Sequence, residues 1–109
     1  MKIKVNGINW NIKFVNSLNH NLLNNNGIYT FGVTDNNLKS VFLSDKISGE
    51  LLYKVLCHEL CHVYCFSYGI YLTVEEEERL AQFISEYGKS IISDTDYLLK
   101  LLFRKDMAL

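Results

Sequence analysis

Hydrophobic and polar residues alternate along the beginning of the chain in a pattern that is typical of short β-strands. Lys2–Val5 and Trp10–Val15 each fit such a strand. Between them lies Asn6-Gly7, a dipeptide that favours tight hairpin turns. The pattern therefore predicts an antiparallel hairpin at the start of the chain.

A polar segment interrupts this pattern before it resumes. Every asparagine lies before residue 38, and Asn19–Asn26 has too little apolar surface to form a core element. We expect this segment to be an exposed, mobile loop. Beyond it, Ile28–Val33 and Ser40–Leu43 predict a second hairpin, which turns at Asp35–Asn37.

The second half of the chain has a helical period instead. We expect three helices, at about 48–67, 74–92 and 95–104, the last beginning after Ser93-Asp94. Ser48 is the expected N-cap of the first helix and Gly69 its stop signal. Strands followed by helices predict an α+β fold, in which a small, mostly antiparallel sheet packs on the first helix and two further helices lie beside it.

Length and composition limit the classes of protein to consider. The chain has 109 residues, 49% of them hydrophobic, and a net charge of −1, which predicts a single domain over residues 1–109. Lysine and arginine are scattered and the acidic run 75–78 would repel phosphates, so nucleic-acid binding is not expected. No segment reaches the ~18 to 20 continuous apolar residues of a membrane span, and the beginning lacks a signal-peptide core. We expect a cytoplasmic protein without membrane association.

One motif in the first predicted helix points to chemistry. The run His58-Glu59-Leu60-Cys61-His62 has the form HExxH. Residues four apart share one face of a helix, so both imidazoles can bind a single metal ion, for which zinc is the expected choice. Glu59 points about 100° round the helix, where its carboxylate can reach a metal-bound water.

The residues around the motif favour a helix with one buried side. Leu52, Leu56, Leu60 and Val63 gather away from the two histidines and can anchor the helix in a core. The alternative interpretation of the motif is an ordinary amphipathic helix that happens to carry two histidines.

A catalytic zinc usually takes three protein ligands and leaves a fourth position for water, so a third ligand is required. The short link 67–72 favours two antiparallel helices. That arrangement brings the run of glutamates at 75–78, which begins the second helix, beside His62.

Two of these four glutamates have structural explanations. Thr73 and Glu76 fit a capping box, and Glu75 suits the positive end of the helix dipole. Glu77 and Glu78 remain. Glu77 lies within the apolar stripe of its helix, whereas Glu78 lies at the border, which suits a site open to water. Periodicity therefore favours Glu78 narrowly and leaves Glu77 as the alternative.

Three cysteines also lie in the first predicted helix. Cys57, Cys61 and Cys65 are spaced four apart, where the side chains diverge too far for an unstrained disulfide, so we expect free thiols. Cys65 lies close to His58 on the helical wheel. It is either a soft alternative metal ligand or, as we favour, a small buried hydrophobe in a helix contact.

Over residues 28–92 the chain resembles the small phage and prophage metallopeptidases of the ImmA/IrrE and minimal-gluzincin type. The segments that carry this resemblance are Gly32-Val33-Thr34-Asp35, Lys39-Ser40-Val41-Phe42-Leu43-Ser44, Ile47-Ser48-Gly49-Glu50-Leu51, Val55 to His62 and Glu78-Arg79-Leu80-Ala81. The resemblance implies a zincin fold, with zinc held by His58, His62 and the glutamate that precedes Arg79, which is Glu78. It also implies that Glu59 is the general base and that a substrate pairs with an edge strand. Residues 39–43 are the candidate edge strand, and the alternative is that this strand is paired on both sides.

The function predicted from these residues is zinc-dependent hydrolysis of peptide bonds in a protein or peptide substrate. Zinc would lower the pKa of a bound water, and Glu59 would accept the proton and pass it to the leaving amine. The residues that could in principle stabilise the oxyanion are His20, Tyr64, Tyr68 and Tyr71, but packing in the core or on the surface is the favoured role of each. The alternatives are a non-catalytic, metal-stabilised interaction module and a metal-free scaffold.

Overall fold

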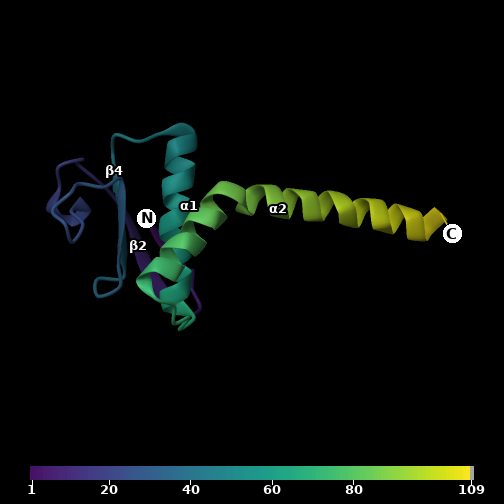
Figure 1. Ribbon diagram of the computed structural model, residues 1–109, viewed down its shortest axis with the longest axis horizontal. Coiled ribbons are helices and arrows are strands. Elements are labelled where there is room, and N and C mark those ends of the chain that lie inside the picture. Colours follow the sequence, from purple (N-terminus) through teal and green to yellow (C-terminus); the bar gives the residue numbers. More distant parts are fainter. Residues whose placement is uncertain (109) are drawn as a thin grey trace.

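A four-stranded sheet occupies the N-terminal half of the chain, and two helices follow it (Figure 1). The computed structural model describes residues 1–108, with side chains through Arg104. Its elements are β1 (Lys2–Val5), β2 (Ile8–Val15), the 3-10 turn η1 (His20–Leu22), β3 (Gly32–Asp35), β4 (Ser40–Ser44), α1 (Gly49–Ser67) and α2 (Val74–Ala108). The fold is α+β, as the sequence predicts.

The sheet is mixed, with the strand order β1-β2-β4-β3. β1 pairs antiparallel with β2 and β3 pairs antiparallel with β4, whereas the central pair, β2 and β4, is parallel. The predicted N-terminal hairpin is confirmed. Asn6 and Gly7 have φ angles of 48° and 78°, the two positive values that a tight type I′ turn requires.

The prediction that residues 39–43 form an edge strand is wrong. β4 is hydrogen-bonded to β2 on one side and to β3 on the other, and all five of its residues are buried. The continuous apolar run Val41-Phe42-Leu43 is typical of a strand that is covered on both faces. Among the described strands, β3 is the one at this edge of the sheet. It begins at Gly32, later than predicted, and before it Tyr29 forms only an isolated bridge with Leu23.

Most of the asparagine-rich segment 19–26 is exposed, as expected, but one of its residues contributes to the core, which corrects the expectation that it forms no core element. Leu22 in η1 is fully buried, and η1 contacts β4 and β3. The side-chain oxygens of Asn16, Asn19 and Asn24 each accept a hydrogen bond from the backbone N–H two residues later. These Asx turns provide local hydrogen-bond partners for the backbone N–H groups. The segment can therefore hold its conformation with few apolar side chains.

The main core lies between the sheet and α1. Val5, Trp10, Ile12, Val41, Leu43 and Val63 form a buried cluster, and Leu52, Leu56 and Leu60 pack against it. The predicted anchoring side of the first helix is therefore confirmed. Trp10 also links the sheet to the helix by a hydrogen bond, because its indole N–H donates to Ser67 Oγ at the end of α1 over 2.9 Å.

The end of α1 and the start of α2 are both capped by hydrogen bonds. Gly69 has a φ of 63°, its N–H donates to Phe66 O, and the N–H of Ile70 donates to Cys65 O, which together form a Schellman motif. The predicted stop at Gly69 is confirmed. The capping box is confirmed as well, since Thr73 N–H donates to Glu76 Oε1 and Glu76 N–H donates to Thr73 Oγ1. Ser48 holds the N-cap position of α1 without a side-chain cap hydrogen bond.

The third predicted helix does not exist as a separate element. α2 runs without a break from Val74 to Ala108, through Ser93 and Asp94. Neither residue breaks a helix as proline does, so the N-cap signal that they offer does not end the helix. Figure 1 shows that α2 runs beside α1 and then extends far from the rest of the molecule. Among the described residues, neither helix combines the length and apolarity needed to cross a membrane.

Candidate metal centre

Helix α1 presents the two motif histidines toward a cleft. Their rings lie one turn apart, with centroids separated by 5.1 Å at an angle of 66°. The opposite side of α1 is held in the core by Val63 and its apolar neighbours. Because this packing fixes the helix, the two imidazoles are held in place by a rigid element.

α2 is antiparallel to α1 and brings Glu78 to both rings. Glu78 Oε2 lies 3.0 Å from His58 Nε2, and Glu78 Oε1 lies 3.0 Å from His62 Nε2. The three residues each offer a ligand atom within 4.8 Å of the others, so the group could hold a metal ion. In a tetrahedral zinc site with bonds of about 2.0 Å, neighbouring ligand atoms are about 3.3 Å apart, and each of the two contacts between Glu78 and a histidine is close to that distance.

Glu77 occupies a different position beside the same pair. Its Oε1 lies 2.7 Å from His62 Nδ1, the ring nitrogen that faces away from Glu78, and its side chain is only 14% exposed. An ionised carboxylate only accepts hydrogen bonds, so in a contact with ionised Glu77 the Nδ1 atom is the donor. Such a contact orients a histidine and leaves Nε2 to face a metal ion. The two candidate ligands therefore differ in the ring atoms that they contact. Glu78 contacts the Nε2 atoms of both histidines, whereas Glu77 contacts Nδ1 of His62.

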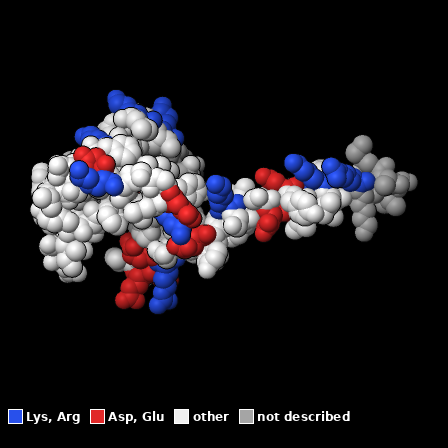
Figure 2. All heavy atoms as spheres, turned by 90° about the horizontal axis from the view of Figure 1, so that it is seen from above, with Lys and Arg blue, Asp and Glu red and all other residues white. Residues whose placement is uncertain are grey.

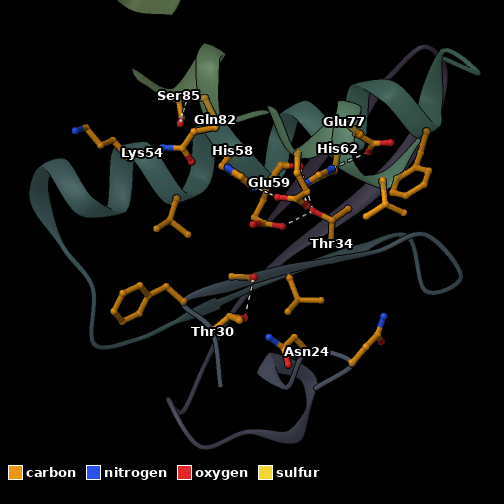
Figure 3. A pocket seen from close by; sticks show the side chains of 18 of the residues that line it. Asn24, Thr30, Thr34, Lys54, His58, Glu59, His62, Glu77, Gln82 and Ser85 are labelled. Carbon is orange, nitrogen blue, oxygen red and sulfur yellow. Dashed lines mark hydrogen bonds and ion pairs between the residues drawn. The ribbon is translucent and has the colours of Figure 1, made fainter. Parts of the chain in front are cut away.

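Glu59 is buried directly behind the histidines. Its relative exposure is 7%, and Oε1 accepts a 2.9 Å hydrogen bond from the Thr34 hydroxyl on β3 (Figure 3). Burial raises the pKa of the Glu59 carboxyl above its ordinary value, while the Thr34 hydrogen bond and the imidazoles of His62 and His58 oppose that rise. A carboxyl in such surroundings is suited to hold and release a proton.

The cleft in front of these residues has a volume of about 1020 Å³. α1 and the start of α2 form one wall, and residues 30–34 with the loop around Asn24 form the other, so Thr30 and Asn24 face the histidines across the opening (Figure 3). Five consecutive residues of the second wall line the cleft, ending in β3. An extended chain could therefore lie in the cleft along the outer edge of β3.

Some residues that the sequence suggests for this site lie elsewhere. Among the described residues that line the cleft, none is His20, Tyr64, Tyr68 or Tyr71, so these possible oxyanion donors are not brought to it, which agrees with the packing roles that the sequence favours. Tyr64 and Tyr68 instead stack on each other with ring centroids 5.9 Å apart. Cys65 belongs to a buried cluster with Cys61 and Ala81 between the helices and is not part of the metal-binding group.

Two residues at the site are missed by sequence reasoning. Thr34 contacts Glu59 from a position 25 residues away, and local periodicity carries no signal of such a contact. Gly32 allows β3 to approach α1 closely, because a Cβ atom there would lie 2.9 Å from Val55 Cγ1 and 3.0 Å from Glu59 Cγ. A glycine inside a strand pattern is the one signal that could have indicated this close approach.

Comparisons of the chain with protein-family models, with curated proteins and with solved structures found no match.

Proposed function

We propose that this protein is a zinc-dependent metallopeptidase of the type that its HExxH motif resembles. The observation that carries the proposal is the contact of both Glu78 carboxylate oxygens with the Nε2 atoms of His58 and His62, beside a buried Glu59. Two imidazoles and one carboxylate form the ligand set of a catalytic zinc, which leaves a position for water. The donor atoms present fit that ion.

When bound, zinc supplies a Lewis acid that polarises a carbonyl and lowers the pKa of water. The chain's own residues supply the rest. Glu59 takes the proton from the attacking water and delivers it to the leaving amine, because its carboxyl is the buried acid beside the ligand atoms. Thr34 fixes the direction of that carboxyl.

We place the substrate along β3. This strand pairs with β4 on one side, and its residues line the cleft below the histidines. An extended peptide that adds to the free edge of β3 would be held by backbone hydrogen bonds, which require no particular side-chain sequence. In this proposal β3 is the edge strand with which the substrate pairs, the role for which residues 39–43 are the candidate in the sequence.

The setting that we propose is the interior of a bacterial cell, with a protein or peptide, such as a phage or mobile-element regulator, as the substrate. The resemblance to phage and prophage peptidases supports this setting. The three free cysteines, two of them buried, fit a reducing compartment.

Glu59→Gln tests the proposal. Glutamine keeps an oxygen that can accept the Thr34 hydrogen bond, but it cannot take a proton from water. We expect near-complete loss of cleavage of a fluorescently labelled unfolded protein, with zinc content and melting temperature preserved. Glu75→Gln, an exposed change on α2, is the matched control and should keep full activity.

The same experiment separates the enzyme from a metal-stabilised interaction module. In the module, zinc only joins α1 to α2, so Glu59→Gln would alter neither partner binding nor any other measured property. Wild-type protein that contains zinc yet cleaves nothing would favour the module. Protein purified without added metal that contains no zinc, and gains no stability when zinc is added, would exclude both functions.

A further inference from the structure

The cleft crosses the outer edge of β3, so it has walls on both faces of the sheet. α1 covers one face, on which Thr34 and the Cβ position of Gly32 lie against Glu59. The segment around η1 covers the other face, because η1 contacts β4 and β3 and Figure 1 shows it on the side of the sheet away from α1. Residues of both layers line the cleft, and Figure 3 shows Asn24 and Thr30 across the opening from the histidines. A peptide that adds to β3 would therefore lie between two different walls.

The side chains of β3 alternate between these two walls. Since Gly32 and Thr34 face α1, Phe31 and Val33 face the opposite side. Phe42 lies on that side one strand further in, where it pairs with Val33, and it is buried at 4% exposure. At the edge of the sheet this cover ends, since Phe31 is 53% exposed and both it and Val33 line the cleft. Phe31 and Val33 thus form an apolar row beside the place of the substrate.

The backbone groups of β3 that point outward fix the register of a paired peptide. Phe31 O accepts a 2.9 Å hydrogen bond from Ser44 N–H, so the ladder with β4 continues through Phe31 and uses every second residue of the strand. The N–H and C=O groups of Gly32 and Thr34 therefore point away from β4. Gly32 O accepts a hydrogen bond from the Thr30 hydroxyl and keeps a second lone pair. A peptide strand would form its backbone hydrogen bonds with Gly32 and Thr34.

The two walls also differ in charge. Among the described residues that line the cleft, all that are titratable lie on α1 or α2, and the wall formed by residues 23–25, 30 and 31 has none. The sequence carries no Lys, Arg, Asp or Glu from residue 14 to residue 34. Figure 2 shows no charged atoms at the end of the molecule that this segment forms, at the far left of the view. A charged side chain that faced this wall would lose hydration without gaining a partner of opposite charge.

We propose that the cleft selects extended peptide segments in which two apolar side chains, separated by one residue, lie on the same side of the cleaved bond. The two apolar side chains lie beside Val33 and Phe31, because neighbouring strands stabilise each other through side chains on the same face. The residue between them lies opposite Gly32. The residue opposite Thr34 lies nearest Glu59, so both apolar residues come on one side of the reacting bond. This inference rests on the proposed function, in which the substrate pairs with β3.

Cleavage-site profiling tests the spacing. Wild type with zinc should cut a library of unstructured peptides with Leu, Ile, Val or Phe enriched at two positions that are separated by one residue, on the same side of the bond. Phe31→Asp should keep the apolar preference nearer the bond and exchange the other for Lys or Arg, since opposite charges pair across strands. Such an exchange of preference is not an effect of partial unfolding.

Leu38→Asp is the matched control for Phe31→Asp. Leu38 follows β3, has an exposure of 57% against 53% for Phe31, and does not line the cleft. This variant should keep the wild-type profile. Cleavage by wild type without the expected spacing, or a Phe31→Asp profile equal to that of wild type, would overturn the inference and leave the peptidase standing.

Peptide binding tests the same inference without cleavage. Fluorescence anisotropy with Glu59→Gln protein compares two labelled peptides of equal composition, in which two leucines are either separated by one serine or adjacent. Only one of two adjacent side chains can face the apolar row, so the separated pair should bind about two- to fivefold more tightly. Phe31→Asp in the same protein should abolish the difference.

The two readouts separate the inference from the proposed function. If wild type cleaves nothing but the peptide with separated leucines binds more tightly, the specificity of the cleft stands and the peptidase fails. Equal affinities of the two peptides, or no binding of either, would overturn the inference.

Discussion

The hydroxyl of Thr34 lies 2.9 Å from Oε1 of Glu59 and 3.1 Å from the backbone carbonyl oxygen of the same residue. Thr34 comes from the edge strand β3, and Glu59 from the middle of α1. The hydroxyl can donate to the ionised carboxylate. It can also turn to donate to the carbonyl and accept a hydrogen bond from the protonated carboxyl. One side chain therefore satisfies Glu59 in both forms that a proton-transferring group must adopt.

Thr34→Val should separate catalysis from metal binding. Valine has nearly the shape of threonine but offers no hydroxyl, so Glu59 loses its hydrogen bond while the histidines are untouched. A hydrogen bond to a charged group contributes about 1.5–3 kcal/mol, which corresponds to a roughly 10- to 100-fold lower kcat. Steady-state kinetics should show the loss in kcat, with KM and zinc content close to the wild-type values.

Thr34→Ser is the control for this change. Serine keeps the hydroxyl and loses only a methyl group, so we expect it to retain most of the activity. If Thr34→Val kept full kcat, or if the serine variant lost as much as the valine variant, Thr34 would have no part in directing Glu59.

Glu77 and Glu78 should differ in how strongly their loss weakens zinc binding. Glu77→Ala removes the partner of His62 Nδ1, and loss of such an orienting carboxylate typically weakens metal binding by about 10- to 100-fold. Glu78→Ala removes the group that faces both Nε2 atoms, so the affinity should fall further. Competition with a fluorescent zinc chelator measures both effects.

Glu75→Ala changes an exposed residue on the same helical turn. It is the control for the loss of one negative charge, which all three alanine variants have in common. It should leave the zinc affinity unchanged. An affinity that falls more for Glu77→Ala than for Glu78→Ala would exchange the roles that we assign to the two glutamates.

The parts of the structure that follow from short-range rules could be predicted from the sequence. Helical periodicity places His58 and His62 on one face and their anchoring leucines on another, and the caps at Gly69 and Thr73 depend on residues a few positions apart. Periodicity also favours Glu78 over Glu77 narrowly, because a position at the border of an apolar face suits a site open to water. The proximity of Glu78 to both rings agrees with that choice.

The parts that depend on tertiary partners could not be predicted in this way. Which strand lies at the edge is decided by pairing between β2 and β4, and their sequences are separated by the entire segment 16–39. The apolar run Val41-Phe42-Leu43 favours a central strand, whereas the position of this strand just before α1 favours an edge strand. The contact between Thr34 and Glu59 likewise exists only once β3 has packed on α1.

Gly32→Ala should displace β3 from α1. The new Cβ atom would lie 2.9 Å from Val55 Cγ1, 3.0 Å from Glu59 Cγ and 3.3 Å from Leu43 Cδ2, so the strand, the helix or the Glu59 side chain must shift. Overpacking of this kind costs roughly 1–3 kcal/mol of unfolding free energy. We expect a lower melting temperature together with reduced activity. Wild-type stability would show that the cleft accommodates the methyl group without movement.

Cys65→Ala should leave the metal centre intact. Cys65 is buried beside Cys61 and Ala81, and burial raises the pKa of its thiol, so at neutral pH it lacks the thiolate that binds metal ions. Burial likewise raises the pKa of the Cys61 thiol to about 12. Removing the buried sulfur atom leaves a small cavity, for which we expect about 1 kcal/mol of destabilisation in a denaturant titration. Zinc content should equal that of wild type, and a zinc-depleted but folded Cys65→Ala protein would show instead that the sulfur atom is a ligand.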